Sequence, residues 1–165
     1  MSVNPRLQEL LDRHGPRYEI VPHRETVTAH QAAQTAHVSG AHVAKAVVMR
    51  DAAGSDFMVV LPASFHLDPR VVHHVTGRAG VRLEDERELL RIFPDCDLGA
   101  MPPIGHLYRM SMVVDPCLLE NQEEIWFQAG NHHELVRMRV EDYERVAHPF
   151  QTSACLHRES AAVGG

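Results

Sequence analysis

Long hydrophobic runs, closely spaced cysteines and clusters of basic residues are missing from this chain of 165 residues. No stretch approaches the ~18 to 20 apolar residues of a membrane-spanning helix, so we expect no membrane segment. Met1 to Arg6 lack the apolar core of a secretory signal, so we expect none. Cys96, Cys117 and Cys155 are odd in number and widely spaced, which predicts neither a disulfide framework nor a structural zinc site. These absences favour a reducing cytoplasm.

The balance of charge excludes a further class of protein. The formal net charge is −6 with neutral histidines, and the hydrophobic fraction of 44% is ordinary for a globular domain. A broad phosphate-binding surface would need clustered Lys and Arg, which argues against a protein that binds long nucleic acids. Recognition of a short nucleic-acid end stays compatible, because few phosphates are touched. Partial protonation of the 13 histidines would make the charge less negative.

Motifs of nucleophilic and metal-dependent catalysis are also missing. The chain contains no G-x-S-x-G and no H-E-x-x-H. Ser64 is interpreted as a turn hydroxyl and Cys117 as a buried thiol, because neither has an evident base nearby in sequence. His132 and His133 stand at a strand junction, where one ring faces a cleft or both lie in a surface loop. We therefore expect no bound metal.

The periodic patterns predict an α+β fold with a mixed β-sheet flanked by helices. Helices are expected at residues 4–14, 28–39, 69–75, 84–92 and 140–146, the second opened by a capping box of Thr28 and Gln31. Strands are expected at 18–21, 43–50, 57–61, 81–83, 107–114, 124–128 and 134–139. We expect one domain over residues 1–148 and a mobile tail over residues 149–165.

Lys45 is the residue of the sequence that says most about function. Lys45 lies inside the predicted strand at 43–50 and shares a face with Val43, Val47 and Met49. Lysine is rarely buried without a partner. Its side chain either extends along the apolar surface to reach water, or points into a pocket that needs a positive charge. The strand alone leaves both interpretations open.

The loop D-L-G-A-M-P-P-I-G at residues 97–105 is the second signal. Pro102 and Pro103 restrict the backbone, while Gly99 and Gly105 permit tight turns. Such a stiff loop is either a simple connector between a helix and a strand, or a holder of backbone N–H groups. Rigid backbone donors are what a developing oxyanion or a substrate carboxyl needs.

Together these features resemble the YbaK/EbsC family, the INS-like editing domain associated with prolyl-tRNA synthetase, whose free-standing members include the ProXp proteins. The resemblance covers residues 18–147 and is sharpest at Lys45 and at the G-x-x-x-P loop from Gly99 to Pro103. Further matching segments are His23, Thr28-Ala29, Val59 to Ala63, Asp115-Pro116 and Ala129-Gly130. The segment after Gly130, Asn131-His132-His133, departs from the family pattern.

The resemblance implies a trans-editing hydrolase that cleaves the ester at the 3′-terminal adenosine of mischarged aminoacyl-tRNA, with no cofactor. In that reading Lys45 orients the aminoacyl-adenosine end, while the Gly99 to Pro103 backbone holds the ester or its water. The residues implied to contact substrate are His23, Thr28, Ala100, Met101, Pro102 and His132. The Ala- and Val-rich surroundings of Lys45 favour small amino acids such as alanine, serine or threonine.

Two other functions stay open at this stage. A catalytically inert module of the same fold would keep the pocket and bind ligand without turnover. An adaptor would instead dock on an aminoacyl-tRNA synthetase. The expected partner is the 3′ end of aminoacyl-tRNA, and a synthetase or an elongation factor is a further candidate.

Overall fold

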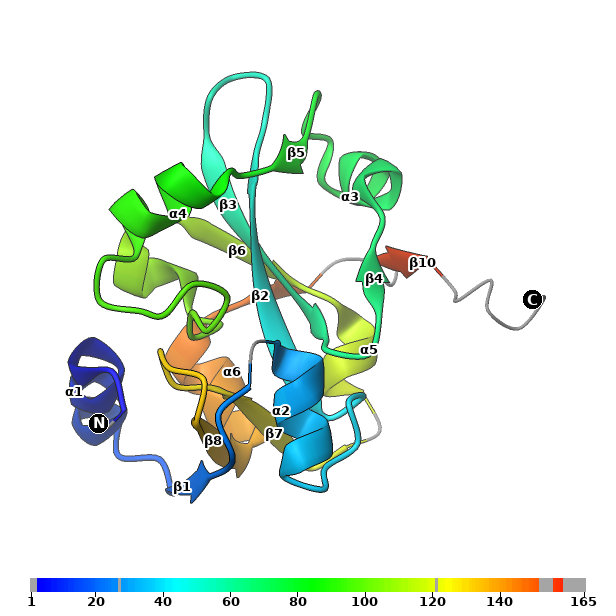
Figure 1. Cartoon of the computed structure of the whole chain (residues 1–165). Helices are drawn as coiled ribbons and strands as arrows, with labels where there is room; N and C mark the ends of the chain where they lie inside the picture. The colour runs from blue at the N-terminus through cyan, green and yellow to red at the C-terminus, as the bar shows by residue number, and fades with distance from the viewer. Residues whose placement is uncertain (1–2, 27, 121, 152–155, 159–165) are drawn as a thin grey trace.

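The structure is a computed structural model that describes residues 3–26, 28–120, 122–151 and 156–158. A central β-sheet has helices on both faces (Figure 1). The helices are α1 (Pro5–His14), α2 (Ala29–Thr35), α3 (Pro69–Thr76), α4 (Glu86–Ile92), the 3-10 helix η1 (Gly105–Tyr108), α5 (Pro116–Leu119) and α6 (Val140–Ala147). The strands are β1 (Tyr18–Pro22), β2 (Val43–Arg50), β3 (Asp56–Pro62), β4 (His66–Leu67), β5 (Arg82–Leu83), β6 (Ser111–Val114), β7 (Glu124–Gln128), β8 (Glu134–Arg139), β9 (Phe150–Gln151) and β10 (His157–Arg158).

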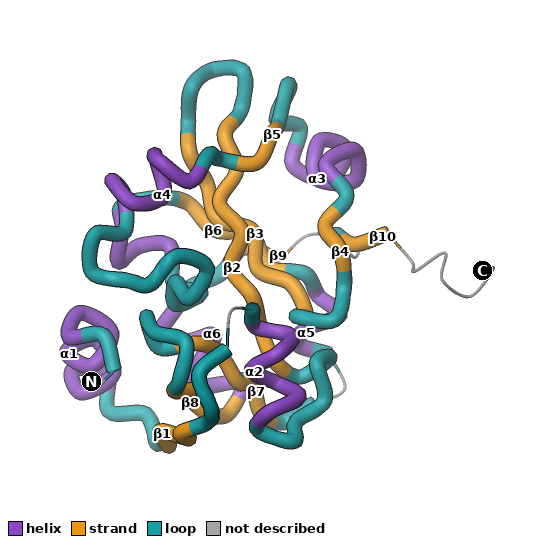
Figure 2. The backbone as a smooth tube through the Cα atoms, in the orientation of Figure 1, coloured by secondary structure: helices purple, strands orange, loops and turns teal. Residues whose placement is uncertain are grey.

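The sheet is mixed, which confirms the predicted fold class. Its strand order is β1-β8-β7-β2-β3-β6-β9, with β5 added beside β2, and a separate ribbon joins β4 to β10. β2 pairs with β3 in the predicted antiparallel hairpin, whereas β2 with β7 and β3 with β6 are parallel. Figure 2 shows β2 and β3 running through the middle of the molecule.

The two faces of the sheet are covered differently. We call the face that carries Val43, Lys45, Val47 and Met49 the lysine face, and the opposite one the core face. On the core face, Ala44 and Val48 belong to one large apolar cluster that also includes buried residues of α1, η1, α5 and α6. On the lysine face, helices α2 and α3 pack over two smaller clusters. The strand alternation predicted for β2 is therefore correct.

Helix α2 is shorter than predicted. It begins after Thr28, whose hydroxyl accepts a hydrogen bond from the Gln31 N–H at 3.1 Å, but it ends at Thr35 instead of near residue 39. His37 adopts a left-handed φ of 59°, and the Val38 N–H donates to Ala33 O at 2.9 Å. This is a Schellman ending with histidine where glycine is usual, so no sequence signal marked it.

The predicted strand at 107–114 is only half right. Residues 105–108 form η1, Arg109 has a left-handed φ of 57°, and the strand is confined to Ser111–Val114. The apolar residues of this segment contact the core from the 3-10 helix and the turn that follows it, and not from a strand. The short elements β4, α5, β9 and β10 were not predicted, because two to four residues are too few for a periodic pattern.

The region predicted as a mobile tail contains two paired segments. β9 is parallel to β6, and β10 is antiparallel to β4. Between them, Leu156 is fully buried and its N–H donates to Asp115 Oδ2 at 3.0 Å. Described residues up to 158 thus contact the body, while residues 152–155 and 159–165 lie outside the described part, and the single-domain boundary at 148 stays a prediction.

The sequence predicted no disulfide framework and no membrane segment, and the structure bears on both predictions. Cys96 is a free thiol, whereas Cys117 is disulfide-bonded, so the interpretation of Cys117 as a buried thiol is wrong. A count of cysteines and their sequence spacing carries no information on which thiols meet in space. Within the described ranges, no helix has the length and apolar character required to cross a bilayer.

Candidate functional site

Lys45 lies on the lysine face between its two apolar clusters. One cluster, under α2, includes Val43, and the other, under α3, includes Met49. The Lys45 ammonium donates a 2.5 Å hydrogen bond to Phe65 O, and burial lowers the pKa of Lys45. The side chain is half-buried, and it is the only lysine in the chain. A desolvated cation held by one neutral carbonyl has capacity left for an anionic or carbonyl ligand.

The loop that receives Lys45 is in turn packed against the end of the α2 region. A Cβ added to Gly40 would lie 2.9 Å from Ser64 Cβ and 3.3 Å from His30 Nδ1, so these three residues are contiguous. The Ser64 N–H points at Gly40 O across 3.4 Å. Glycine at position 40 therefore permits the close approach that places α2 beside the Lys45 hydrogen bond.

Gln128 is a polar residue that the sequence analysis missed. It ends β7 on the same face as Trp126, which contacts the α2 cluster. Because β7 is parallel to β2 with Trp126 beside Val43, the register extended by one more alternation places Gln128 level with Lys45. Only 3% of Gln128 is exposed. A buried amide on an otherwise apolar strand requires partners, and burial is the signal that sequence could not reveal.

The partner of Gln128 is His132, which links it to the glycine-proline loop. Gln128 Nε2 lies 3.4 Å from His132 Nδ1, and His132 Nε2 lies 2.7 Å from Leu98 O. Since a carbonyl oxygen only accepts, Nε2 carries the hydrogen and Nδ1 is the acceptor for the Gln128 amide. Both ring nitrogens of His132 thus have protein partners, and the ring connects the end of β7 to the loop.

The loop itself contains a type II turn over residues 97–100. The Ala100 N–H donates to Asp97 O at 3.0 Å, and Gly99 at the third position has a φ of +84°. Leu98 has no positive φ, so the turn is type II. A type I′ turn would require positive φ at both central residues. A residue with a β-carbon is strained at position 99, which explains the glycine physically.

The His132 contact determines where the Gly99 N–H points. The peptide unit between Leu98 and Gly99 is planar and trans, so its C=O and N–H point in opposite directions. With Leu98 O directed at the His132 ring, the Gly99 N–H is directed away from that ring. The Gly99 and Met101 N–H groups donate to no described residue, whereas Ala100 and Ile104 use theirs within the loop. Residue 99 is exposed, so its N–H is available to a ligand.

The other loop residues predicted to form the site are buried. Met101 is 5% exposed and its side chain belongs to the core-face cluster, so only its backbone can serve the site. Ala100 is fully buried, and Ala100 O accepts from the Gly130 N–H at 2.9 Å. Pro102 is buried, and Pro103 O accepts from the Tyr143 hydroxyl at 2.7 Å. These contacts make the loop rigid. The contacts of Ala100, Met101 and Pro102 with substrate stay a prediction.

His23, a predicted site residue near the N-terminus, and its neighbour Thr26 contact the segment that contains His132. The Thr26 N–H donates to His132 O at 3.0 Å, and the His23 N–H donates to His133 O at 2.8 Å. His23 Nε2 is buried and has no hydrogen-bond partner among the described residues. Thr28 uses its hydroxyl to cap α2. The structure therefore brings together His23, His132 and the Gly99 turn, with Thr28 occupied as a helix cap.

Other ionisable groups near the loop are poor nucleophiles. Burial raises the pKa of the Cys96 thiol to about 12, and the thiol lies 3.2 Å from the Tyr108 hydroxyl. Burial also raises the pKa of Tyr108. Across the described part of the chain, no group of three or more His, Cys, Asp or Glu side chains is placed to hold a metal ion.

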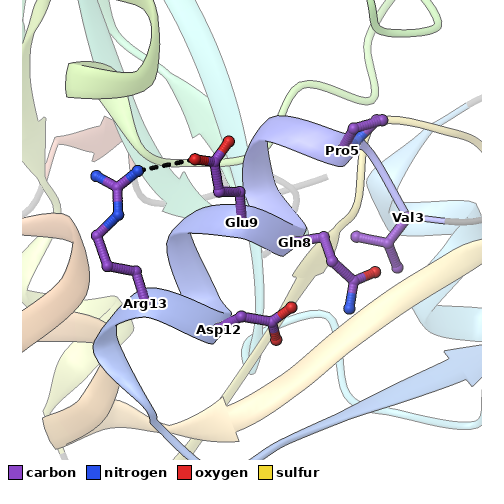
Figure 3. A pocket seen from close by; sticks show the side chains of 6 residues that line it. All are labelled: Val3, Pro5, Gln8, Glu9, Asp12 and Arg13. Atoms are coloured by element: carbon purple, nitrogen blue, oxygen red, sulfur yellow. Dashed lines mark hydrogen bonds and ion pairs between the residues drawn. The ribbon is translucent and has the colours of Figure 1, made fainter.

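Cavity size does not identify the site. A groove of about 650 Å³ lies along α1 and is lined by Val3, Pro5, Gln8, Glu9, Asp12 and Arg13 (Figure 3). Arg13 pairs with Glu9 at 3.0 Å, and Asp12 accepts a hydrogen bond from the Tyr18 hydroxyl at 3.0 Å, so these charged side chains already have protein partners. A second cavity of about 580 Å³ lies beside the turn at residues 97–100, because Asp97, Gly130 and His133 are among its lining residues. The polar cluster on the lysine face is therefore identified by burial and contacts.

Comparison with known proteins adds a family to this geometry. The model of the aminoacyl-tRNA editing domain matches residues 23–146, which include Lys45, the glycine-proline loop and His132. The multifunctional Ser/Thr-tRNA deacylase ProXp-y of Escherichia coli strain K12 is 28% identical over 152 residues, covering 89% of each chain. The protein of the same name from Escherichia coli O157:H7 matches equally.

Solved structures share the fold. One described as a proposed trans-editing enzyme for prolyl tRNA synthetase has a TM-score of 0.79 and 22% identity, covering 95% of this chain and 99% of that one. The hypothetical protein APE2540 has a TM-score of 0.77 and 21% identity, covering 88% and 96%. At this identity the likeness concerns the arrangement of the backbone.

Proposed function

Because this chain belongs to the aminoacyl-tRNA editing domain family, we propose that it is an aminoacyl-tRNA deacylase whose reaction takes place at Lys45 and the Gly99 turn. The observation that carries the proposal is a series of contacts that runs from Gln128, level with Lys45, through His132 to Leu98 O beside Gly99. At one end lies a half-buried, sole lysine whose pKa is lowered by burial. At the other end lies an exposed N–H whose direction is set by the His132 contact with Leu98 O.

The reaction is hydrolysis of an ester. Water adds to the carbonyl carbon, the bond from that carbon to the ribose oxygen breaks, and free amino acid and tRNA with a restored hydroxyl are released. The Gly99 N–H stabilises negative charge that develops on the carbonyl oxygen, as preorganised backbone donors do in acyl transfer. The Lys45 ammonium binds and orients the terminal nucleotide. Neither role requires a protein nucleophile or a metal ion.

The amino acids removed are small. ProXp-y carries Ser/Thr-tRNA deacylase in its name, and the clusters beside Lys45 in this chain are built largely from alanine and valine. A pocket lined by such side chains distinguishes neighbours that differ by one methylene by only ~1 to 3 kcal/mol. We therefore expect activity on alanyl, seryl and threonyl esters together, and exclusion of large aromatic esters by volume.

The substrate places the protein in its cellular context. Aminoacyl-tRNA is formed and used in translation, so we propose a cytoplasmic location. An aminoacyl-tRNA synthetase or an elongation factor would be the source from which the tRNA arrives. The domain acts as one unit over residues 1–148.

A panel of mischarged tRNAs tests the function. Alanyl, seryl, threonyl, prolyl and phenylalanyl esters on their tRNAs are incubated with the protein, and loss of the ester is followed. Turnover of the small esters with the phenylalanyl ester spared is the expected result, and it should survive dialysis against a chelator. Binding of an aminoacyl-adenosine analogue without turnover of any ester would instead identify an inert ligand-binding module.

A further inference from the structure

The elements that cover the lysine face do not share the negative net charge of the whole chain. Residues 23–45 and 62–80, which include α2, β4 and α3, contain four Lys or Arg and two Asp or Glu. Their formal charge is +2, so the remainder of the chain carries −8 of the total of −6. One of the two acids, Asp68, is 7% exposed and caps the start of α3. Arg78 pairs with Asp51 at 2.7 Å, outside these segments, and Lys45 belongs to β2, so the surface itself is close to neutral while the rest of the chain is acidic.

Histidines are concentrated on the same surface. The two segments hold seven of the 13 histidines. Five of these are exposed and their rings form no hydrogen bond with any described residue: His30, His37, His42, His66 and His74. Exposed aromatic rings with N–H groups can stack on unpaired bases and can donate hydrogen bonds to phosphates. An ordinary solvated surface does not require so many rings on one side.

This surface is continuous with the candidate site. His30 is adjacent to Gly40 and Ser64, Ser64 precedes Phe65, and Phe65 O accepts the Lys45 hydrogen bond. His66 begins β4 directly after Phe65, and α3 follows with Arg70 on its first turn. The Arg70 side chain is 78% exposed and lies 3.5 Å from Asp68. A strand of RNA whose last nucleotide is at Lys45 would therefore pass over these side chains.

We propose that the surface formed by α2, residues 63–66 and α3 docks the unpaired 3′ strand and the first phosphates of the tRNA acceptor stem. The imidazole rings next to Lys45 stack on the unpaired bases, and the guanidinium of Arg70 pairs with a backbone phosphate. The proposal rests on the proposed deacylase function, because it takes the position of Lys45 as the end of the RNA. Because this surface is close to neutral, the net charge of −6 on the whole chain does not repel a polyanion here.

Binding of uncharged RNA tests the surface without any turnover. The probe is a labelled hairpin of an acceptor stem with its CCA overhang, titrated by fluorescence anisotropy between 50 and 200 mM salt. Arg70→Glu should weaken binding about tenfold and reduce the salt slope by about one. Arg87→Glu is the matched control, because Arg87 is exposed on α4, whose apolar side packs against the core-face cluster.

A second pair of measurements concerns the overhang. A blunt hairpin should bind more weakly than the one with CCA, and His66→Ala should reduce that difference, because stacking on unpaired bases is worth ~1 to 3 kcal/mol per base. Equal effects of Arg70→Glu and Arg87→Glu, or wild-type affinity in both Arg70→Glu and His66→Ala, would overturn the surface.

The two proposals fail in distinguishable ways. If the wild-type protein binds the hairpin in this manner but hydrolyses none of the esters, the deacylase function is wrong and the docking surface stands. If esters are hydrolysed while the Arg70→Glu variant binds RNA as tightly as Arg87→Glu, the surface is wrong and the function stands.

Discussion

The two faces of the β-sheet are built from the same strands yet have opposite characters. The core face is one continuous apolar cluster in which α1, α6 and their neighbours meet β2, β3, β7 and β8. The lysine face has two small clusters, one under α2 and one under α3, with Lys45 between them. Stability is concentrated on the first face, and polar groups that a ligand can use are concentrated on the second.

The polar character of the lysine face lowers the stability of the protein, which indicates a functional role. A half-buried ammonium with one carbonyl partner is less favourable than an apolar side chain of the same volume. A protein selected for stability alone would join the two clusters of the lysine face. Two separate clusters are typical of a functional site, where stability is lower than the fold allows.

Lys45→Met gives the largest expected effect and tests this comparison directly. Methionine has a similar length and no charge, so it should join the two clusters and raise the free energy of unfolding by ~1 kcal/mol. Deacylation should fall about 30- to 1000-fold, which corresponds to ~2 to 4 kcal/mol of lost transition-state stabilisation. Initial rates and thermal unfolding are measured on the same preparation.

Lys45→Arg serves as the control that keeps the charge. It should retain more activity than Lys45→Met without gaining stability. Wild-type rates in Lys45→Met, or a marked loss of its stability, would show that Lys45 has a structural role and that the lysine face is not the site.

Gly99→Ala is expected to have the next largest effect. The added Cβ is strained at a φ of +84°, so the turn should change its geometry and move the N–H of residue 99. We expect a loss of activity of about tenfold or more and a stability loss of ~1 kcal/mol. Steady-state kinetics and thermal unfolding check both.

Gly15→Ala is a matched control at the C-terminal end of α1. Gly15 ends α1 with a φ of +66° and has open space around its missing Cβ. It should show the same strain and the same stability loss with unchanged activity. If both alanine variants lose activity alike, the effect comes from stability and the Gly99 turn has no special part in the reaction.

Gln128→Leu should have a smaller effect, because it acts through His132. Without the amide, His132 Nδ1 loses its donor, and the ring is held only by Leu98 O. We expect a loss of about tenfold in kcat with KM little changed, since transition-state charge at the Gly99 N–H is affected more than substrate binding.

The nitrogen chemical shifts of His132 provide the readout that a structural role would not change. In the wild type they should report hydrogen on Nε2, and in Gln128→Leu a mixture of both tautomers. Gln128→Asn, with its amide one methylene shorter, should behave between the two. An unchanged tautomer together with lost activity would mean that Gln128 acts on the substrate directly.

Asp56→Asn should have the smallest effect and concerns stability alone. Burial, followed by the neighbouring Glu84 carboxyl, raises the pKa of Asp56 to about 6. An unfolded aspartate titrates near ~3.9, so between about pH 4 and pH 6 the folded state binds more protons than the unfolded state. The free energy of unfolding therefore falls as pH rises through this window.

Asparagine removes that dependence, because it resembles the protonated carboxyl. At pH 7.5 Asp56→Asn should be more stable than the wild type by ~1 kcal/mol, and near pH 4 the difference should disappear. Thermal unfolding at both pH values measures it. Asp56 lies at the start of β3, so deacylation should be unchanged. A variant less stable than the wild type at pH 7.5 would contradict the shift.

Local patterns were sufficient for the long elements. The alternation at residues 43–50, the proline at the start of α3 and the apolar spacing of α1 each depend on neighbours within a few positions. The end of α2 and the start of β6 were misplaced, because His37 and Arg109 adopt left-handed φ angles that their residue types do not favour. Packing imposes those conformations, and no local signal announces them.

The sequence alone determined the class of fold, the strand that carries Lys45 and the stiffness of the glycine-proline loop. These follow from short-range sterics and from the period of two along a strand. Only the tertiary structure decided that Gln128 is buried level with Lys45, that His132 contacts Leu98 O, and that the histidine-rich segments cover one face. Contacts between residues tens of positions apart depend on how the strands are ordered in the sheet, and a chain read from end to end does not contain that order.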